Sequence, residues 1–480
     1  MNKLQSHFMG TLKMWGINCV FSFSDGHSLE IKPENESVEV FYAKCKELEG
    51  NFDNLDWIYG LSNWGENVAF RPAKSQGPFS YIKGTLSLIV DIVLCSYCSK
   101  DSKEANKGEE LHRFNAIDFC GESIDAIFSP KCIFESITIT ENKIEWSSVE
   151  DYAKSFKTII GKIPCALIFT VFVDRKDIDR DETSLGTLRS ILRLEFEEPQ
   201  DVSLIEECWQ SACYFLTFCT GHFNVSDFRI SLWDEKKPIG TYGAPGVIDC
   251  QINSTTVENI KYTGQPYNRF QVSWLNDKVG RLFELIACKD SRPRLGFLPR
   301  TNTDIDVDSH KVRELCTAFE VEYQLREKEF EPDEPKELVE ILKKTIRDYK
   351  KNHSGELSED IYNSAFNSVG FISLPAREKI WAIYSQCREA IDAEFVKMGL
   401  FPKTTFDFSE EKTRADIQWL VKLRNSITHS SAVAEQDIPN AIYSRLRIAV
   451  YCSVFTRVGY SSAEIIALVN AYFNGEYTKQ

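Results

Sequence analysis

The stretch Val421-Lys422-Leu423-Arg424-Asn425-Ser426-Ile427-Thr428-His429 lies near the C-terminus of a 480-residue chain. When this stretch and the residues before it are placed on a helix at about 100° per residue, apolar side chains fill one broad arc. That arc consists of Ala415, Ile417, Trp419, Leu420, Val421, Leu423 and Ile427. Arg424 falls inside it, between Leu420 and Ile417. A guanidinium on an apolar face is costly without an anion or a fixed partner, so the helix predicts either a buried ion pair or a cation presented to a phosphate.

Length and composition predict a globular protein of two or three domains, since 480 residues exceed what one hydrophobic core usually supports. A content of 43% hydrophobic and 12% aromatic residues excludes a disordered chain. The net charge of −15 argues against a generic nucleic-acid coat protein. Residues 309–480 are nearly neutral, however, with 23 Lys and Arg against 26 Asp and Glu, a net of −3. A local basic site is therefore compatible with this C-terminal part.

The sequence also bears on the compartment. The start, Met1 to His7, lacks the apolar segment of a secretion signal. The longest apolar run, Ile163 to Val173, is interrupted by Pro164 and is too short to span a bilayer. Fifteen cysteines without a signal sequence are typical of free thiols in a reducing compartment. We therefore expect a cytoplasmic protein without a membrane partner.

The order of the predicted elements indicates an α+β protein with three regions. Residues 1–150 form a β-rich region, in which Ser24-Asp25-Gly26-His27 is a plausible hairpin turn because Asp-Gly tolerates positive φ. Its clearest predicted strands are 12–15, 19–23, 28–31, 86–94, 136–140 and 142–146. Residues 151–308 continue this region as mixed α and β, with strands at 167–173, 192–196 and 227–233 and a buried helix at 204–219.

Residues 309–480 are helical almost throughout. The predicted helices are 309–329, 336–351, 358–369, 376–398, 410–428, 438–457 and 462–473. Short loops between long helices indicate a bundle. The acidic segment Thr301 to Asp308 marks the boundary before it.

Arg347 and His353 provide a contrast to Arg424 and His429. On their predicted helix the apolar arc consists of Leu338, Ile341, Leu342, Thr345, Ile346 and Tyr349. Arg347 lies opposite, about 180° from Leu338, among four lysines. We therefore predict a solvated face for Arg347, unlike the apolar setting of Arg424.

The residues around Arg424 suit cleavage of an RNA phosphodiester bond without a metal. Histidine suits proton transfer because its unperturbed pKa is about 6.5. Arginine suits the phosphorane because its charge is permanent and its donors are forked. Asn425 would fix the histidine tautomer or donate to phosphate. One His429 cannot easily act as base and acid in the same step, but two copies across a two-fold interface can.

The alternative is structural. Arg424 would pair with a carboxylate such as Glu320, and His429 would merely cap the helix end. Spacing alone favours this alternative.

Three other motifs do not predict a cofactor or metal site. Cys95 and Cys98 have zinc-knuckle spacing but lack a second ligand pair. The segment Gly240 to Gly246 lacks the Lys-Ser/Thr of a P-loop. The alternating aspartates Asp304, Asp306 and Asp308 lack the glycine and terminal glutamate of a calcium loop. We expect isolated thiols, a loop and a solvated linker.

The string Leu423 to His429 resembles the R-x4–6-H motif of HEPN domains, with the polar residue that this motif prefers directly after the arginine. The motif also lies at the end of a late helix in a predicted bundle, with a long helix after it. The whole chain resembles the ApeA abortive-infection proteins of bacteria, in which a β-rich N-terminal region precedes a C-terminal HEPN domain. This resemblance assigns the catalytic role to Arg424, Asn425 and His429.

The resemblance implies an anti-phage endoribonuclease that needs no metal and acts as a homodimer or higher oligomer through its HEPN bundle. RNA would be the substrate, and the N-terminal region would restrain the bundle until a phage-derived trigger appears. Two other hypotheses remain open. The bundle would be a non-catalytic dimerisation or interaction module, or the chain would be a toxin held by a partner antitoxin.

Overall fold

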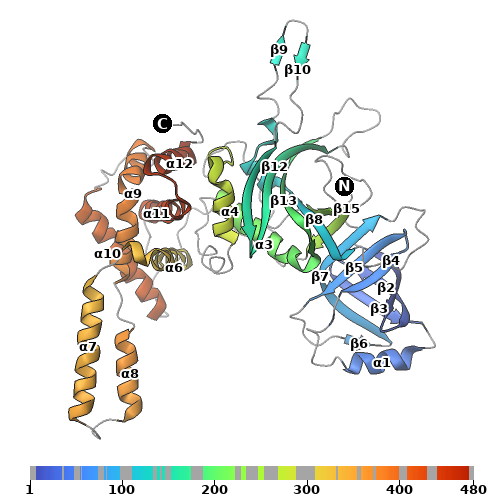
Figure 1. The fold of residues 1–480 in the computed structure, drawn as a ribbon, viewed down its shortest axis with the longest axis horizontal. Coiled ribbons are helices and arrows are strands. Elements are labelled where there is room, and N and C mark those ends of the chain that lie inside the picture. The colour runs from blue at the N-terminus through green and yellow to red at the C-terminus, as the bar shows by residue number, and fades with distance from the viewer. Residues whose placement is uncertain are drawn as a thin grey trace. The chain divides into compact units, whose positions relative to one another are not determined.

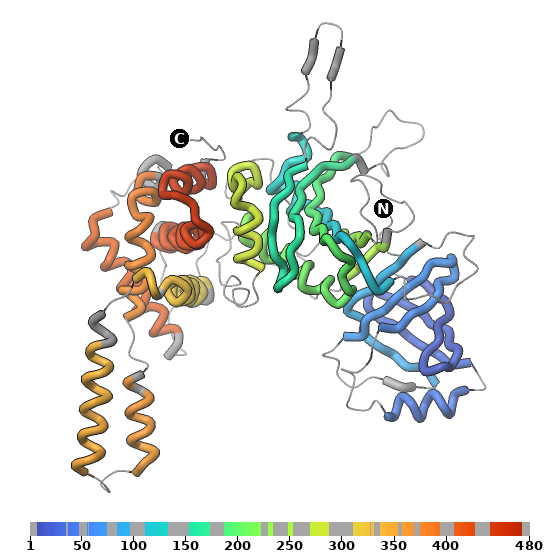
Figure 2. The backbone as a smooth tube through the Cα atoms, viewed as in Figure 1, coloured from blue at the N-terminus to red at the C-terminus, as the bar shows by residue number. Residues whose placement is uncertain are grey.

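In a computed structural model, the chain folds into two compact units, Met1–Lys289 and Asp290–Gln480. Figures 1 and 2 colour the chain from the N-terminus to the C-terminus. The structure describes residues 7–34, 37–47, 55, 57–73, 80–82, 84–97, 111–132, 138–140, 143–145, 153–174, 187–221, 229–233, 247–252, 269–287, 309–330, 333–353, 358–370, 375–398, 408–429 and 440–474. The predicted boundary at 301–308 lies outside these ranges.

The molecule is α+β, with a barrel-containing sheet in unit 1 and helices in unit 2 (Figure 1). Unit 1 is organised by a 13-stranded antiparallel sheet. Part of that sheet closes into a barrel, because β1 pairs with β4 and β5 pairs with β7. The barrel strands, in order around the ring, are β1 (Phe8–Met14), β2 (Ile17–Ser24), β3 (Ser28–Pro33), β7 (Thr85–Tyr97), β5 (Glu66–Pro72) and β4 (Ile58–Ser62).

Side chains fill the barrel interior, as expected for a small barrel. Strand alternation points Phe8, Phe21, Phe23 and Phe70 inward, and all four are buried. The rings of Phe8 and Phe23 lie 5.1 Å apart, and those of Phe21 and Phe70 lie 5.2 Å apart. Helix α1 (Val38–Glu47) adds Phe41 to the same core. The barrel is therefore a packed core with an aromatic centre.

The predicted hairpin turn between β2 and β3 is confirmed. Asp25 and Gly26 have φ values of 55° and 73°, and the His27 amide donates to the Ser24 carbonyl at 3.2 Å, so both central residues of this β-turn are left-handed. Trp15 and Gly16 adopt the same conformation between β1 and β2, with φ values of 52° and 81°. The predicted strand 12–15 is wrong at Trp15, which lies in this turn, because a tryptophan rarely occupies the left-handed region.

The rest of the sheet extends from β7 through β15 (Val247–Ile252), β14 (Arg229–Trp233), β8 (Arg113–Cys120), β13 (Thr187–Asp201), β12 (Ile163–Asp174) and β11 (Lys154–Ile160). Strand β6 (Ser80–Ile82) pairs with β7, and β9 (Thr138–Thr140) pairs with β10 (Lys143–Glu145). The predicted strands near 170, 194 and 230 and the predicted pair near 140 are therefore confirmed.

Three helices of the described part of unit 1 accompany this part of the sheet. They are α2 (Glu122–Ile127), α3 (Ile205–Thr220) and α4 (Val279–Ala287), with 3-10 turns η7 (Val202–Leu204) and η8 (Asn276–Lys278). Helix α3 is the predicted buried helix, and both α2 and α4 pack against it.

One charged network is buried within this sheet. Arg193 Nε donates to Asp118 Oδ1 at 2.6 Å, and its Nη2 donates to Oδ2 at 2.8 Å. Trp233 Nε1 also donates to Asp118 Oδ2, at 2.8 Å. Both charged side chains are only 2% exposed. Because two charges are removed from water together, each depends on the other.

Unit 2 is all-helical over its described ranges. Its helices are α6 (Ser309–Leu325), α7 (Asp333–Asn352), α8 (Glu359–Gly370), α9 (Ala376–Met398), α10 (Glu410–His429), α11 (Asn440–Val458) and α12 (Ser462–Asn474), with a 3-10 turn η9 (Glu327–Glu329). Each predicted helix of this region is present. Helix α9 is central, because α6, α10, α11 and α12 all pack against it. No helix within the described ranges combines the length and apolar character that crossing a bilayer requires.

Candidate functional site

The candidate site lies at the C-terminal end of α10. The helix starts after Ser409, whose hydroxyl accepts from the Lys412 amide at 3.2 Å and so caps the first turn. Glu410 and Glu411 follow in that turn, where negative charge interacts favourably with the positive end of the helix dipole. The helix ends at His429. Local sequence signals therefore define its start and place the motif in its last turns.

The packed side of α10 contains Arg424, as predicted. Ile417, Leu420 and Leu423 are buried, and α10 packs against α6 and α9. Arg424 is four residues after Leu420 and seven after Ile417, so it shares their side of the helix. The predicted arc is wrong at one position, because Ala415 is exposed. Its small side chain lies at the edge of the arc and adds little apolar area.

Arg424 forms an ion pair with α6. Its Nη2 donates to Glu320 Oε1 at 2.6 Å, and its Nη1 donates to Asn425 Oδ1 at 3.2 Å. The side chains of Arg424 and Glu320 are 28% and 29% exposed. The structure therefore contains the carboxylate pair that the sequence offered as the structural alternative. The same exposure leaves the guanidinium accessible to a solute from the solvent side.

Asn425 and His429 follow Arg424 toward the helix end. Asn425 is exposed. Residues 425 and 429 are one turn apart, a spacing that places two positions on the same side of a helix. The side chain of His429 lies outside what the structure describes, so the geometry brings together Arg424, Asn425 and Glu320.

A buried thiol lies near the ion pair. Cys316 stands one turn before Glu320 on α6 and is buried. Burial raises the pKa of Cys316 to about 12, while the Arg424 charge lowers it and the Glu320 charge raises it. The thiol therefore stays protonated near neutral pH and does not serve as a nucleophile.

The described part of the chain contains no cluster of three or more His, Cys, Asp or Glu side chains arranged to hold a metal ion. Cys95 is half-buried on β7 and has a free thiol. It belongs to no such cluster among the described residues. Cys98, the segment Gly240 to Gly246 and the aspartates Asp304, Asp306 and Asp308 lie outside the described ranges.

The contrasting arginine, Arg347, is exposed as predicted. Its guanidinium lies 5.1 Å from the centre of the Phe366 ring on α8. His353 stacks on Tyr349 with ring centroids 4.2 Å apart, and its Nδ1 lies 3.2 Å from the Tyr349 carbonyl oxygen. This arginine and histidine are thus engaged with aromatic neighbours within a helical hairpin.

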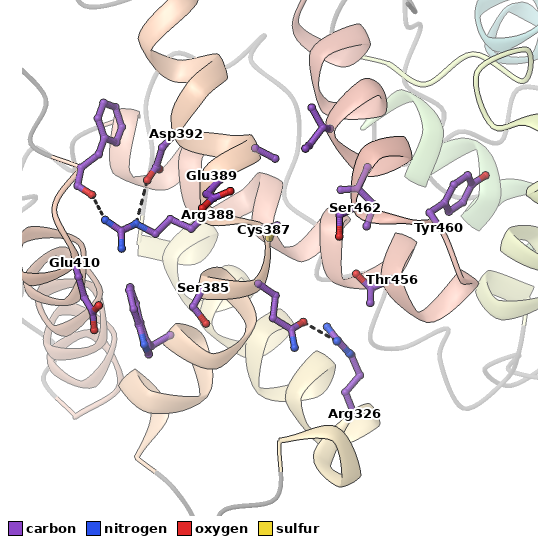
Figure 3. A pocket seen from close by; sticks show the side chains of 16 residues that line it. Arg326, Ser385, Cys387, Arg388, Glu389, Asp392, Glu410, Thr456, Tyr460 and Ser462 are labelled. Atoms are coloured by element: carbon purple, nitrogen blue, oxygen red, sulfur yellow. Dashed lines mark hydrogen bonds and ion pairs between the residues drawn. The ribbon is translucent and has the colours of Figure 1, made fainter. Parts of the chain in front are cut away.

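A second candidate is a cavity of about 1120 Å³ at the other end of α10, shown in Figure 3. Glu410 lines it, about 20 Å along the helix axis from Arg424 at 1.5 Å per residue. Its two arginines are already occupied. Arg326 donates to Gln386 at 2.6 Å, and Arg388 pairs with Asp392 at 3.4 Å (Figure 3). Among the described lining residues, no cation therefore remains unused for an anionic ligand.

A buried polar network in unit 2 was not predicted. Glu322 on α6 accepts from Arg457 at 2.7 and 3.0 Å and from the Ser453 hydroxyl at 2.8 Å. Arg326 donates to the same serine at 3.2 Å. The available signal was the appearance of arginines within the otherwise apolar helix α11. This network joins α6 to α11 and thereby fixes the helix that carries Glu320.

Comparison with protein-family models, with curated proteins and with solved structures found no match for this chain.

Proposed function

We propose that this chain is a metal-independent endoribonuclease of anti-phage defence, with Arg424, Asn425 and His429 as its active residues. The observation that supports this best is the setting of Arg424. A guanidinium on the packed side of α10 is held at 2.6 Å by Glu320 and still reaches solvent. Such a cation is positioned in advance for a phosphate, which is the property a phosphoryl-transfer site requires.

In the proposed reaction, the ribose 2′-hydroxyl attacks the adjacent phosphorus. A base removes the 2′ proton, and the bond from phosphorus to the 5′-oxygen breaks as an acid protonates that oxygen. The products are a 2′,3′-cyclic phosphate and a 5′-hydroxyl. Arg424 stabilises the charge that develops on the phosphorane. His429 transfers a proton, and Asn425 orients it or binds phosphate.

Because one histidine does not easily give and take a proton in one step, a second copy of the site completes the set across a homodimer. We propose that this oligomer forms through the helical bundle.

The Glu320 pair does not prevent this reaction. A partly exposed ion pair contributes about 0.2–1 kcal/mol, so a phosphate can share or displace the carboxylate at low cost.

Regulation follows from the danger of an uncontrolled ribonuclease in a cytoplasm. Residues 1–308 carry −12 of the net charge of −15, since residues 309–480 hold −3. We propose that this acidic N-terminal part restrains the bundle until a phage-derived signal releases it, which would produce abortive infection.

The second candidate is a non-catalytic interaction protein. The Arg424–Glu320 ion pair favours it, because a structural role would need this contact and nothing else. A toxin held by an antitoxin is a variant of the first proposal, and co-purification of a small partner would identify it.

The test is cleavage of single-stranded RNA by the purified full chain in excess EDTA, with and without extract from phage-infected cells. We expect His429→Ala and Arg424→Ala to lose about 10²–10⁴-fold in rate, the usual contribution of acid–base catalysis. The double variant Arg347→Ala/His353→Ala is the matched control and should retain full activity. Equal cleavage by all variants would reject the assignment, as would the absence of cleavage under both conditions.

A further inference from the structure

Helices α9 and α11, which pack directly against each other, each contribute a cysteine to their interface. Cys387 on α9 is half-buried and lines the cavity shown in Figure 3. Cys452 on α11 is only 1% exposed. Both are free thiols. A small solute in the cavity therefore reaches Cys387 but does not reach Cys452.

Contacts of the neighbouring residues show that these two positions lie on facing sides of the helices. Arg326 donates to Gln386 at 2.6 Å and to the Ser453 hydroxyl at 3.2 Å. Gln386 directly precedes Cys387, and Ser453 directly follows Cys452. One guanidinium therefore spans the interface beside the two cysteines and connects α9 to α11 at this level.

The two thiols are in direct contact. The Cys387 thiol donates to the Tyr384 carbonyl of its own helix at 3.7 Å, which leaves its sulfur as an acceptor. The Cys452 thiol donates a hydrogen bond to that sulfur, and this bond and burial raise the pKa of Cys452. Thr456, one turn after Cys452 on the same side of α11, lines the same cavity as Cys387 (Figure 3). The contact therefore lies at the wall of the cavity.

We propose that Cys387 and Cys452 are a site of reversible oxidation, at which a hydroperoxide that enters the cavity converts the two thiols into a disulfide bond between α9 and α11. A cysteine that solvent reaches, placed beside a second thiol, is the arrangement that this oxidation requires. Thiols already in contact need only a small approach of the two helices to reach bonding distance.

The difference in exposure sets the order of the steps. The Cys387 sulfur attacks one oxygen of hydrogen peroxide, the oxygen–oxygen bond breaks, and the released hydroxide takes up the thiol proton as water. The Cys452 sulfur then attacks the sulfenic sulfur of Cys387, the sulfur–oxygen bond breaks, and a second water leaves with the Cys452 proton. In sum, two thiols lose two electrons, and one peroxide is reduced to two molecules of water.

The contact between the thiols favours the disulfide over further oxidation of Cys387. A nucleophile held beside its target reacts as if it were present at a very high concentration, so Cys452 reacts with the sulfenic acid before a second peroxide does. The site lies outside the residues proposed for RNA cleavage and does not depend on that function.

The test is peptide mapping of the oxidised full chain. The protein is reduced, freed of reductant, treated with a small excess of hydrogen peroxide, blocked with N-ethylmaleimide in denaturant and digested for mass spectrometry. We expect a cross-linked peptide pair that contains Cys387 and Cys452 in most chains, a monomer on a non-reducing gel, and loss of the cross-link with dithiothreitol.

Cys19 and Cys45 in unit 1 are the internal control. They lie close enough for the charge of one to raise the pKa of the other, but they are 2% and 1% exposed. Burial also raises the pKa of both to about 11. Because neither thiol reaches solvent, both should remain reduced under the same treatment.

Two variants then test the order of the steps, with circular dichroism to verify folding. In Cys452→Ser, Cys387 should accumulate as a sulfenic acid that dimedone traps. In Cys387→Ser, Cys452 should remain a thiol. The wild-type result decides the proposal if a variant does not fold.

Four results for the wild-type chain would overturn the proposal. They are a Cys387 that remains a thiol, a Cys387 that persists as a sulfenic acid, a disulfide from Cys387 to any residue other than Cys452 of the same chain, and a cross-link that appears only as helical circular dichroism is lost. Oxidation of Cys452 in the Cys387→Ser variant would overturn it as well.

Discussion

Replacement of Arg424 by alanine separates a catalytic arginine from a structural one. The change removes the 2.6 Å contact with Glu320, whose side chain is 29% exposed. A carboxylate with this exposure returns to water when its partner is lost, so the free energy of unfolding should fall by no more than about 1 kcal/mol.

A buried ion pair in unit 1 provides a comparison for the Arg424–Glu320 pair within the same protein. Arg193 and Asp118 are joined by a contact of the same 2.6 Å length, but both side chains are 2% exposed. Asp118→Asn would remove the buried negative charge that faces the Arg193 guanidinium, which costs about 3–5 kcal/mol. The two variants break pairs of equal contact length. Their predicted costs differ several-fold because the Arg193–Asp118 pair is buried and has two hydrogen bonds, whereas the Arg424–Glu320 pair is partly exposed and has one.

Differential scanning calorimetry measures both effects. For a domain of about 150–250 residues, 1 kcal/mol shifts Tm by about 2–4 °C. We expect Arg424→Ala to remain within this shift while RNA cleavage is lost, and we expect Asp118→Asn to exceed it. A fall in stability from Arg424→Ala as large as that from Asp118→Asn would refute the reasoning and favour a structural arginine.

Three further predictions concern other contacts. Glu320→Gln keeps an acceptor for Arg424 but removes the competing charge, so RNA should bind more tightly by fluorescence anisotropy; weaker binding would contradict this. Gly280→Ala should destabilise unit 1 by about 1–3 kcal/mol in urea, because an added Cβ would lie 2.1 Å from the Lys157 carbonyl oxygen; unchanged stability would contradict it. Burial raises the pKa of Cys19 and Cys45 from 9.0 to about 11, so the unfolded chain loses these protons first and unfolding free energy should fall between about pH 9 and 11. Cys45→Ala should flatten that slope in urea titrations at successive pH values.

The helices of unit 2 were predictable because their apolar residues recur with a helical period. The seven predicted segments match α6 to α12 within a few residues. The barrel of unit 1 was not predictable in the same way. Its closure depends on pairing between β5 and β7 and between β1 and β4, contacts between segments that local periodicity does not specify. Helix α4 did carry an amphipathic pattern, from Val279 to Ile286, and was missed.

The candidate site was predictable only in part. Periodicity placed Arg424 on the packed side of α10, and the helical bundle made Glu320 a reasonable partner. Which carboxylate pairs with the arginine is decided by the packing of α6 against α10, across 104 positions of sequence. The apolar arc of α7 was also predicted, but its exposure was not, because periodicity shows that a face is apolar and not what covers it.

The end groups of cleaved RNA test the central claim most directly. RNA incubated with the full chain in excess EDTA, in the presence of infected-cell extract, should carry 2′,3′-cyclic phosphate and 5′-hydroxyl ends. The same reaction with His429→Ala, matched for Tm, should yield none above the level of extract alone. Products with 5′-phosphate ends, or identical cyclic-phosphate ends from His429→Ala, would contradict a metal-independent site built on Arg424, Asn425 and His429.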